Sequence, residues 1–162
     1  MKIGVISDTH IPQSADKLPE KLLTGLKGVD LIIHAGDIGD LAVISSLKRV
    51  CKKIKAVHGN MDPPEIQKKF PKKDVFLIHK HKVGLMHGYG TPQGIPELAE
   101  KAFKKDKVDI IIFGHSHAAL NEIKNGILFF NPGSPTDKVF AAYNSYGIIE
   151  IDDCVRANII KI

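Results

Sequence analysis

The sequence predicts an α/β protein in which two mixed β-sheets pack face to face, with helices on their outer sides. Residues 2–57 alternate short β-branched runs with segments of helical spacing, the order that gives parallel strands joined by crossover helices. Residues 120–161 instead hold several strands in succession, which is typical of an antiparallel sheet. With 162 residues, 43% of them hydrophobic and 25% charged, the chain is expected to form one domain over residues 1–162.

Three apolar runs in the first half each end in polar residues and are predicted to be buried strands. They span residues 2–7, 31–33 and 54–57. Helical spacing between the first two runs predicts a helix over residues 17–26, with Asp16 as its N-cap and Gly28 beyond its end. A second helix is predicted over residues 41–48, with Asp40 as its N-cap.

The second half is predicted to begin with a break in the chain at Pro63-Pro64. Helical spacing resumes over residues 97–105, and the dipeptide Asn125-Gly126 predicts a tight hairpin turn. The strands predicted in this half span residues 75–78, 83–86, 109–113, 120–124, 127–130, 139–143, 146–151 and 155–161.

Charge and composition narrow the class of protein. The net charge is +5, but the lysines are spread over the whole chain and no aromatic ladder interleaves them. A solvated, lysine-rich surface is therefore expected rather than a stacking platform for single-stranded nucleic acid. No apolar run approaches the roughly 20 residues that span a bilayer, and the N-terminal segment is too quickly polar for a signal peptide. The two cysteines form no CxxC pattern, so we expect a cytoplasmic protein with free thiols and no membrane partner.

Five short polar clusters follow apolar runs, at positions where strands are predicted to end. They are Asp8-Thr9-His10, Gly36-Asp37, Gly59-Asn60, His87-Gly88 and Gly114-His115-Ser116-His117. Ligands of open α/β sheets bind outside the carboxyl ends of the strands, so we expect these side chains to converge in one cleft. Two carboxylates, one amide and four imidazoles match the ligand set of a site with two divalent metals. The set predicts metal-assisted hydrolysis of a phosphoester.

In this order and at these strand ends, the clusters make the sequence resemble the calcineurin-like metallophosphoesterase superfamily. The compact phosphodiesterase branch of the superfamily is the most similar, and it carries the segment Asn131-Pro132-Gly133-Ser134 near its site. The resemblance covers essentially the whole chain. It implies a four-layer α-β-β-α metallophosphoesterase sandwich and an enzyme that hydrolyses a phosphodiester through a hydroxide bridging two metals.

The resemblance also implies a role for each side chain. One metal would be bound by Asp8, His10 and His117, the other by Asn60, His87 and His115, with Asp37 bridging both. Asp37, Asn60 and His87 would form the catalytic group around the hydroxide. The implied cofactors are two divalent ions, Mn²⁺ first, with Ni²⁺, Co²⁺, Fe or Zn²⁺ as alternatives. Two dications, two aspartates and one hydroxide sum to about +1, which suits a phosphodiester monoanion.

One position departs from the pattern of many superfamily members, which carry a histidine directly after the asparagine. This chain has Met61 there, followed by Asp62. Without that histidine to protonate the leaving group, we expect a preference for good leaving groups such as those of aryl diesters. Asp62 could assist the reaction, or it could cap the Pro-Pro turn that follows.

Substrate contacts are predicted for Asn60, His34, His58 and Tyr89. The two histidines precede metal-ligand positions, so each could instead orient a ligand or simply be a satisfied histidine at a strand end. Tyr89 could equally pack in the core. The residues leave cyclic nucleotides, oligonucleotide ends and small diesters open, because specificity lies in pocket walls assembled from distant loops.

Two alternatives to a phosphodiesterase acting on a small diester remain at this point. The first is a catalytically weak scaffold, because the small subunit of the retromer complex shares this compact fold. All seven ligand positions are kept in this chain, which favours metal binding. The second is a nuclease, suggested by the basic charge alone. The sequence carries no signal for an oligomeric state.

Overall fold

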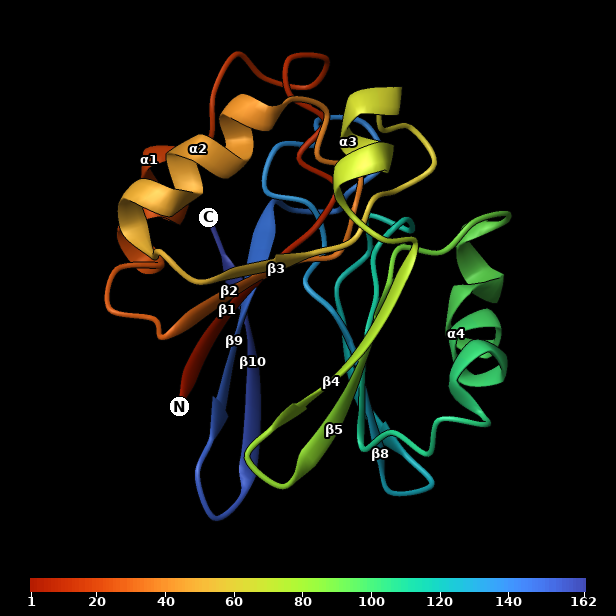
Figure 1. The fold of residues 1–162 in the computed structure, drawn as a ribbon. Coiled ribbons are helices and arrows are strands. Elements are labelled where there is room, and N and C mark those ends of the chain that lie inside the picture. The colour runs from red at the N-terminus through yellow and green to blue at the C-terminus, as the bar shows by residue number, and fades with distance from the viewer.

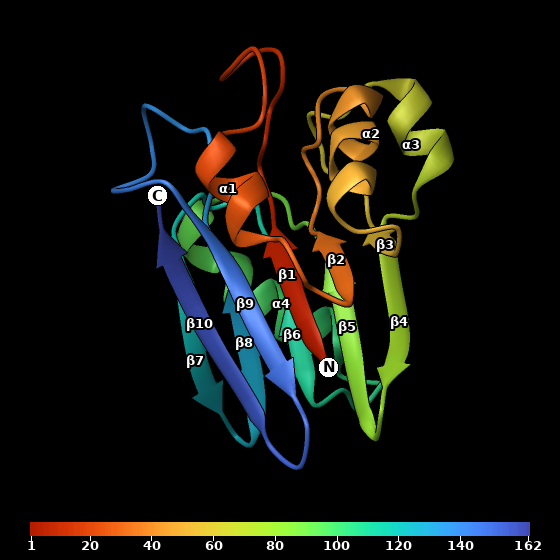
Figure 2. The same cartoon turned by 90° about the vertical axis from the view of Figure 1, so that its left-hand side faces the viewer.

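Two five-stranded sheets pack face to face in the computed structural model, which describes residues 1–162 (Figures 1 and 2). The first sheet consists of β1 (Lys2–Ile6), β2 (Leu31–His34), β3 (Ile54–Ala56), β9 (Ser145–Ile151) and β10 (Val155–Lys161), in the order β10-β9-β1-β2-β3. The second consists of β4 (Lys73–Ile78), β5 (His81–Met86), β6 (Ile110–Ile112), β7 (Leu120–Lys124) and β8 (Ile127–Asn131), in the order β4-β5-β6-β8-β7.

Helices cover the outer faces of both sheets, so the predicted four-layer α-β-β-α sandwich is confirmed (Figure 1). The helices are α1 (Glu20–Gly25), α2 (Leu41–Val50), α3 (Pro64–Lys69), the 3₁₀ turn η1 (Pro92–Gly94) and α4 (Ile95–Phe103). In Figure 1, α1 and α2 lie against the first sheet and α4 lies against the second. None of the helices has the length and apolar character needed to cross a membrane.

Three apolar clusters fill the spaces between the four layers. Leu22 of α1 and Leu47 of α2 pack against the first sheet, and Phe103 of α4 packs against the second. The central cluster joins the inner faces of the two sheets and includes Phe130, which is completely buried. Gly147 of β9 makes room for this ring, since a Cβ there would lie 2.3 Å from Phe130 Cε1.

The strands that carry the site run parallel within each sheet. β1, β2 and β3 are parallel neighbours, with Ile6 paired to His34 at the carboxyl ends of β1 and β2. β5, β6 and β8 are parallel neighbours in the second sheet. The carboxyl ends of β1, β2 and β3 therefore lie at one edge of the first sheet, where their arrowheads point in Figure 2.

Two local predictions are confirmed at the level of single hydrogen bonds and torsion angles. The carboxylate of Asp40 accepts a hydrogen bond of 2.7 Å from the backbone of Ala42, which caps α2 as predicted. Asn125 and Gly126 both have positive φ, at 53° and 78°, as the tight turn between β7 and β8 requires. Both cysteines are free thiols; Cys51 is buried and Cys154 is exposed.

The prolines shift helix boundaries from where helical spacing placed them. α1 begins only at Glu20, because the residue before a proline avoids helical torsion angles and Pro19 holds the N-cap position. Asp16 is therefore not the N-cap. Pro64 begins the short helix α3 where only a chain break was predicted, since proline is well tolerated in a first helical turn.

The predicted strand over residues 139–143 is wrong. This segment is an irregular loop in which Val139 and Phe140 are 78% and 79% exposed. Its backbone N–H groups cannot join a sheet, because those of Val139, Phe140 and Ala141 donate to the carboxylate of Asp137. Local side-chain acceptors of this kind compete with strand pairing.

We expect Phe130→Ala to lower the free energy of unfolding by about 3–5 kcal/mol, because it opens a cavity between the two sheets. Leu77→Ala is the matched control: Leu77 is 67% exposed on β4, and its truncation should change stability by less than about 0.5 kcal/mol. Urea unfolding followed by circular dichroism measures both. Similar losses for the two variants would contradict the assignment of the central core.

Candidate metal centre

All seven predicted ligand residues lie in loops that directly follow strands with a parallel neighbour in one of the two sheets. Asp8 and His10 follow β1, Asp37 follows β2, Asn60 follows β3, His87 follows β5, and His115 and His117 follow β6. Both sheets therefore contribute ligand residues to one edge of the sandwich. These side chains converge there, as expected.

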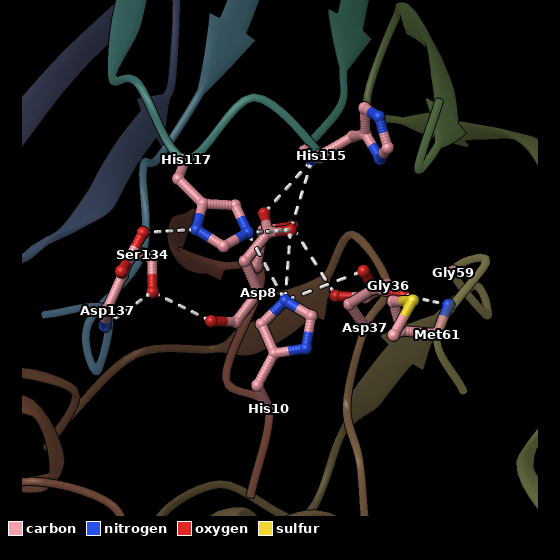
Figure 3. A network of polar contacts seen from close by, with 12 residues as sticks. Asp8, His10, Gly36, Asp37, Gly59, Met61, His115, His117, Ser134 and Asp137 are labelled. Atoms are coloured by element: carbon pink, nitrogen blue, oxygen red, sulfur yellow. Dashed lines mark hydrogen bonds and ion pairs between the residues drawn. The ribbon is translucent and has the colours of Figure 1, made fainter. Parts of the chain in front are cut away.

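Asp8, His10 and His117 form the first potential ligand group, with ligand atoms all within 4.8 Å of one another. His117 Nε2 lies 3.3 Å from Asp8 Oδ1 and 3.2 Å from His10 Nε2. Figure 3 shows both imidazoles directed at the Asp8 carboxylate. Two imidazoles and a carboxylate form a donor set suited to first-row divalent metals.

Asp37, His87 and His115 form the second group, again with ligand atoms within 4.8 Å of one another. Asp37 Oδ2 lies 3.1 Å from His87 Nε2 and 3.5 Å from His10 Nε2, so this oxygen reaches both groups. Asn60 Oδ1 lies 2.9 Å from His115 Nδ1 at the exposed side of the group. A carboxylate between two ligand groups is the arrangement that a bridging role requires.

Backbone geometry aims these side chains into the site at a local cost. Five of the seven residues have left-handed backbone torsion angles: Asp8 (φ 55°), His10 (41°), Asp37 (53°), His115 (71°) and His117 (56°). Non-glycine residues adopt this region rarely, and such strain concentrates at functional sites. Gly59 allows the loops to approach, because a Cβ there would lie 2.0 Å from Asp37 Oδ1.

Hydrogen bonds from the surrounding backbone hold the carboxylates in place. Asp37 Oδ1 accepts from Met61 N at 2.8 Å, which leaves Oδ2 directed at the imidazoles. The Asp8 carboxylate accepts from the backbone N–H of His115 at 3.1 Å. Outer contacts of this kind orient ligands before any ion binds.

His87 shows how well the residues fit a metal. Its Nδ1 donates to the Ala35 carbonyl at 2.7 Å, which turns Nε2 toward Asp37. The His87 side chain is 2% exposed, yet Nε2 forms no aligned hydrogen bond, although Asp37 Oδ2 lies 3.1 Å away. A buried ring nitrogen without a partner costs free energy unless something binds it. Together with the carboxylates beside it, this atom fits a divalent cation.

Asp137 was not predicted from the sequence. It is buried, and its carboxylate is hydrogen-bonded to His117 Nδ1. A carboxylate on the outer nitrogen of a histidine fixes the orientation of the ring and strengthens it as a ligand. The sequence signal that could have found Asp137 is its position three residues after Ser134, in the segment that the resemblance places near the site. The structure places this segment there, since the Ser134 hydroxyl donates to the Asp8 carbonyl at 2.7 Å.

The pKa values of the site show strong coupling between imidazoles and carboxylates. Burial alone would lower the pKa of His87, but Asp8 and Asp37 outweigh it and raise the pKa to about 9. Burial also opposes protonation of His117, and its contacts with Asp8 and Asp137 raise its pKa to about 9. Burial would raise the pKa of Asp8, whereas the two imidazoles lower it to about 2. In the absence of a metal, protons therefore balance the buried negative charge.

His34 lies beneath the site and has no exposed surface. Its Nε2 is 3.0 Å from the Thr9 hydroxyl, and its Nδ1 accepts from Gly36 N at 3.2 Å. Burial lowers the pKa of His34 to about 3, so its ring is neutral. His34 thus links the loops that carry Asp8 and Asp37.

Asp62 ties two loops of the site together. It is buried, and its two carboxylate oxygens accept from Gly39 N and Gly59 N, each at 2.8 Å. The alternative role as a cap of the Pro-Pro turn is wrong, because Pro63 holds the N-cap of α3 without a side-chain hydrogen bond. Asp62 instead fixes the loop from which Asn60 projects.

Two cavities adjoin the centre. The larger one has a volume of about 690 Å³ and is lined by ligand residues of both groups together with Met61, Lys138 and Phe140. The smaller one, of about 220 Å³, lies beside Asn60 and His87 and is lined by His58, Lys72 and Tyr89. His58 and Tyr89 are thus brought beside the centre, and Tyr89 is 54% exposed.

An α-β-β-α sandwich whose strand ends gather histidines and aspartates in this way defines the class of metal-dependent phosphoesterases. A family model described as the calcineurin-like phosphoesterase superfamily domain matches residues 1–154. The chain belongs to this superfamily. The resemblance inferred from the motifs is therefore confirmed.

Relatives agree with this assignment, and a solved structure shares the fold. A probable metallophosphoesterase of Methanocaldococcus jannaschii is 40% identical over 137 residues, which cover 84% of this chain and 69% of the relative. A phosphodiesterase of the same organism is 30% identical over 148 residues, covering 82% of this chain and 83% of the relative. The fold is similar to a crystal structure of Vps29 from Entamoeba histolytica complexed with Zn²⁺, at a TM-score of 0.81 and 24% identity over 99% of both chains.

The metal-free protein should lose stability as the pH rises from 6.5 to 9. Raised pKa values of His87 and His117 mean that their protonated forms stabilise the fold fully below about pH 6.5, and this contribution disappears as the pH passes about 9. Metal affinity should rise over the same range, because protons and metal compete for the same nitrogens. Urea unfolding in chelator and Mn²⁺ titration at both pH values measure this. Stability that increases with pH in the chelated protein would refute the coupling.

Proposed function

We propose that this phosphoesterase is a phosphodiesterase that uses two divalent metal ions, with Mn²⁺ as the first candidate. The observation that carries the proposal is the position of Asp37, whose Oδ2 lies within 3.5 Å of imidazole nitrogens from both ligand groups. The name of the 30% identical relative, a phosphodiesterase, supports the same reaction.

Each ligand group is proposed to hold one ion. Asp8, His10 and His117 would hold the first, His87, His115 and Asn60 would hold the second, and Asp37 would serve both. When bound, a pair of divalent ions acidifies water and neutralises charge on the phosphoryl oxygens.

The residues of the chain supply orientation and charge. Backbone donors at Met61 and His115 hold the Asp37 and Asp8 carboxylates in fixed positions, so little rearrangement is needed when substrate arrives. Asn60 contributes a neutral amide where a carboxylate would cancel positive charge. A site with a small net positive charge favours a phosphodiester monoanion.

The reaction is proposed to favour substrates with good leaving groups. Met61 is 68% exposed at the wall of the larger cavity and offers no proton. Asp62 has both oxygens engaged by backbone N–H groups, which argues against its proposed assistance as an acid. Aryl diesters should therefore be hydrolysed faster than alkyl monoesters.

Substrate contacts are proposed for Asn60, His58 and Tyr89, which adjoin the centre in the smaller cavity. Lys72 lies 5.2 Å above the Tyr89 ring and adds positive charge there. His34 is left out of this group because burial gives it no surface that a substrate could touch. The scaffold alternative has sequence similarity behind it, since vacuolar protein sorting-associated protein 29 of Schizosaccharomyces pombe is 34% identical over 84% of this chain. The two complete groups of potential metal ligands favour the enzyme instead. The nuclease alternative draws on net charge alone and is not proposed.

Asp37→Ala should abolish hydrolysis, with a loss of roughly 100-fold or more in kcat. The variant removes the one carboxylate shared by both groups, so bound metal per chain should fall as well. Metal analysis and hydrolysis of bis(p-nitrophenyl) phosphate with Mn²⁺, Ni²⁺, Co²⁺ and Zn²⁺ give the two readouts. Asp40→Ala is the control, because Asp40 caps α2 outside the site. Full activity in Asp37→Ala, or none in the unaltered protein with any of these metals, would exclude the proposal.

Asn60→Asp should weaken binding of the diester and of inorganic phosphate by roughly tenfold, because a negative charge added beside the anion repels it. The effect should shrink at high salt, where exposed charges are screened. Michaelis constants and phosphate inhibition constants at low and high ionic strength measure it. Asn125→Asp adds the same charge in the exposed turn between β7 and β8, at the opposite end of β7 from the ligand loop, and should change neither constant. Tighter phosphate binding in Asn60→Asp would contradict the charge argument.

A further inference from the structure

The loop that follows Asp137 presents apolar side chains to solvent at the mouth of the larger cavity. Val139 is 78% exposed and Phe140 is 79% exposed, more than any other large apolar side chain of the protein. Exposure of such groups is unfavourable for a free surface and commonly marks a place where something binds. Lys138, Val139 and Phe140 all line the cavity of about 690 Å³ above the metal centre.

Asp137 holds this loop in a defined shape despite its exposure. Its carboxylate accepts hydrogen bonds from the backbone N–H groups of Val139 at 2.7 Å, Phe140 at 3.1 Å and Ala141 at 3.0 Å. The same carboxylate contacts His117 Nδ1. The loop is therefore positioned against a ligand of the first group rather than free to move, which lowers the entropic cost of binding at this surface.

The Phe140 ring stands beside the centre with most of its surface open. Its centroid lies 5.9 Å from that of His117, with an angle of 79° between the rings. Met61 and Asp137, which precedes the Val139-Phe140 loop, lie on opposite sides of the Asp8 and His10 side chains in Figure 3. The apolar residues that line the cavity are Met61, Val139 and Phe140, whereas its ligand residues are polar or charged.

We propose that Phe140 determines specificity for phosphodiesters that carry a planar aromatic group, either an aryl group or a nucleobase. The aromatic group stacks on the exposed Phe140 ring while the phosphate occupies the metal centre, and Lys138 offers positive charge at the rim. Stacking on an aromatic side chain tolerates different rings, because each has a π face. The inference deepens the proposed phosphodiesterase function and rests on it for the position of the phosphate.

The other exposed apolar side chains support a local role for this loop. Leu77 on β4 and Ile123 on β7 are single residues on edge strands, 67% and 73% exposed, and neither lines the larger cavity. Isolated apolar residues of this kind are ordinary features of a protein surface. Val139 and Phe140 differ because they are adjacent, anchored and beside metal-ligand residues.

Binding of three phosphonate or phosphate probes to the Mn²⁺-loaded protein tests the proposal without requiring turnover. The probes are phenylphosphonate, adenosine 5′-monophosphate and methylphosphonate, measured by calorimetry. Phe140→Ala should weaken binding of at least one aromatic probe by roughly tenfold and leave methylphosphonate unchanged, as expected for loss of one stacking contact. Phe140→Trp should retain the preference, and Leu77→Ala serves as the exposed control on a distant strand.

The pattern of losses identifies the source of the aromatic group. A loss for phenylphosphonate alone assigns the surface to small aryl esters, and a loss for the nucleotide assigns it to nucleobases. Equal losses for all three probes would overturn the inference, because Phe140 would then act through His117 and the metals. An unchanged aromatic preference in Phe140→Ala would overturn it too, as would a change only in the association of chains by analytical ultracentrifugation, which would make the loop a contact between copies.

Failure of the inference can be told apart from failure of the proposed function. Metal-dependent hydrolysis of a diester without any aromatic preference would leave the phosphodiesterase intact and remove the role of Phe140. Aromatic probes that bind through Phe140 in a protein that hydrolyses no diester would support the role of Phe140 and remove the phosphodiesterase.

Discussion

The packing of the two sheets against each other is the constraint on which the site depends. Asp8, His10, Asp37 and Asn60 come from loops of the first sheet, whereas His87, His115 and His117 come from loops of the second. Hydrogen bonds such as His87 Nδ1 to the Ala35 carbonyl cross between these loops. The apolar core between the sheets, centred on residues such as Phe130, sets their relative position. A shift of one sheet would pull apart the members of each ligand group without altering any of their residues.

Charge balance explains why so polar a cluster can remain buried. Asp8 is completely buried and Asp37 nearly so, and unpaired carboxylates in such surroundings would be very unfavourable. Raised pKa values at His87 and His117 supply protons in the metal-free protein, and divalent cations can replace those protons. The same arrangement therefore serves folding and metal binding. Surrounding donors, from Met61 to Asp137, reduce the rearrangement that an incoming ion would require.

The order of strands and helices and the convergence of the polar clusters could be predicted from the sequence, because each apolar run ended in residues that carry chemistry. The contacts made by Asp62 and Asp137 could not. Asp62 joins Gly39 to Gly59, and Asp137 joins His117 to its own loop, and such pairings depend on tertiary distances that no periodicity encodes. The β-branched and aromatic residues near Val139 suggested a strand because propensity ignores the competing carboxylate of Asp137. The helix α3 was missed because Pro63-Pro64 suggested a chain break, whereas proline is tolerated in the first turn of a helix.

Each ligand group draws on both sheets: His117 joins Asp8 and His10, and Asp37 joins His87 and His115. Any ion held by either group would consequently link the two sheets at this edge of the sandwich. By thermodynamic linkage, an ion that binds the folded protein more tightly also raises its melting temperature further. A chelator would then lower the stability of the whole sandwich, and activity would be lost together with part of the folding free energy.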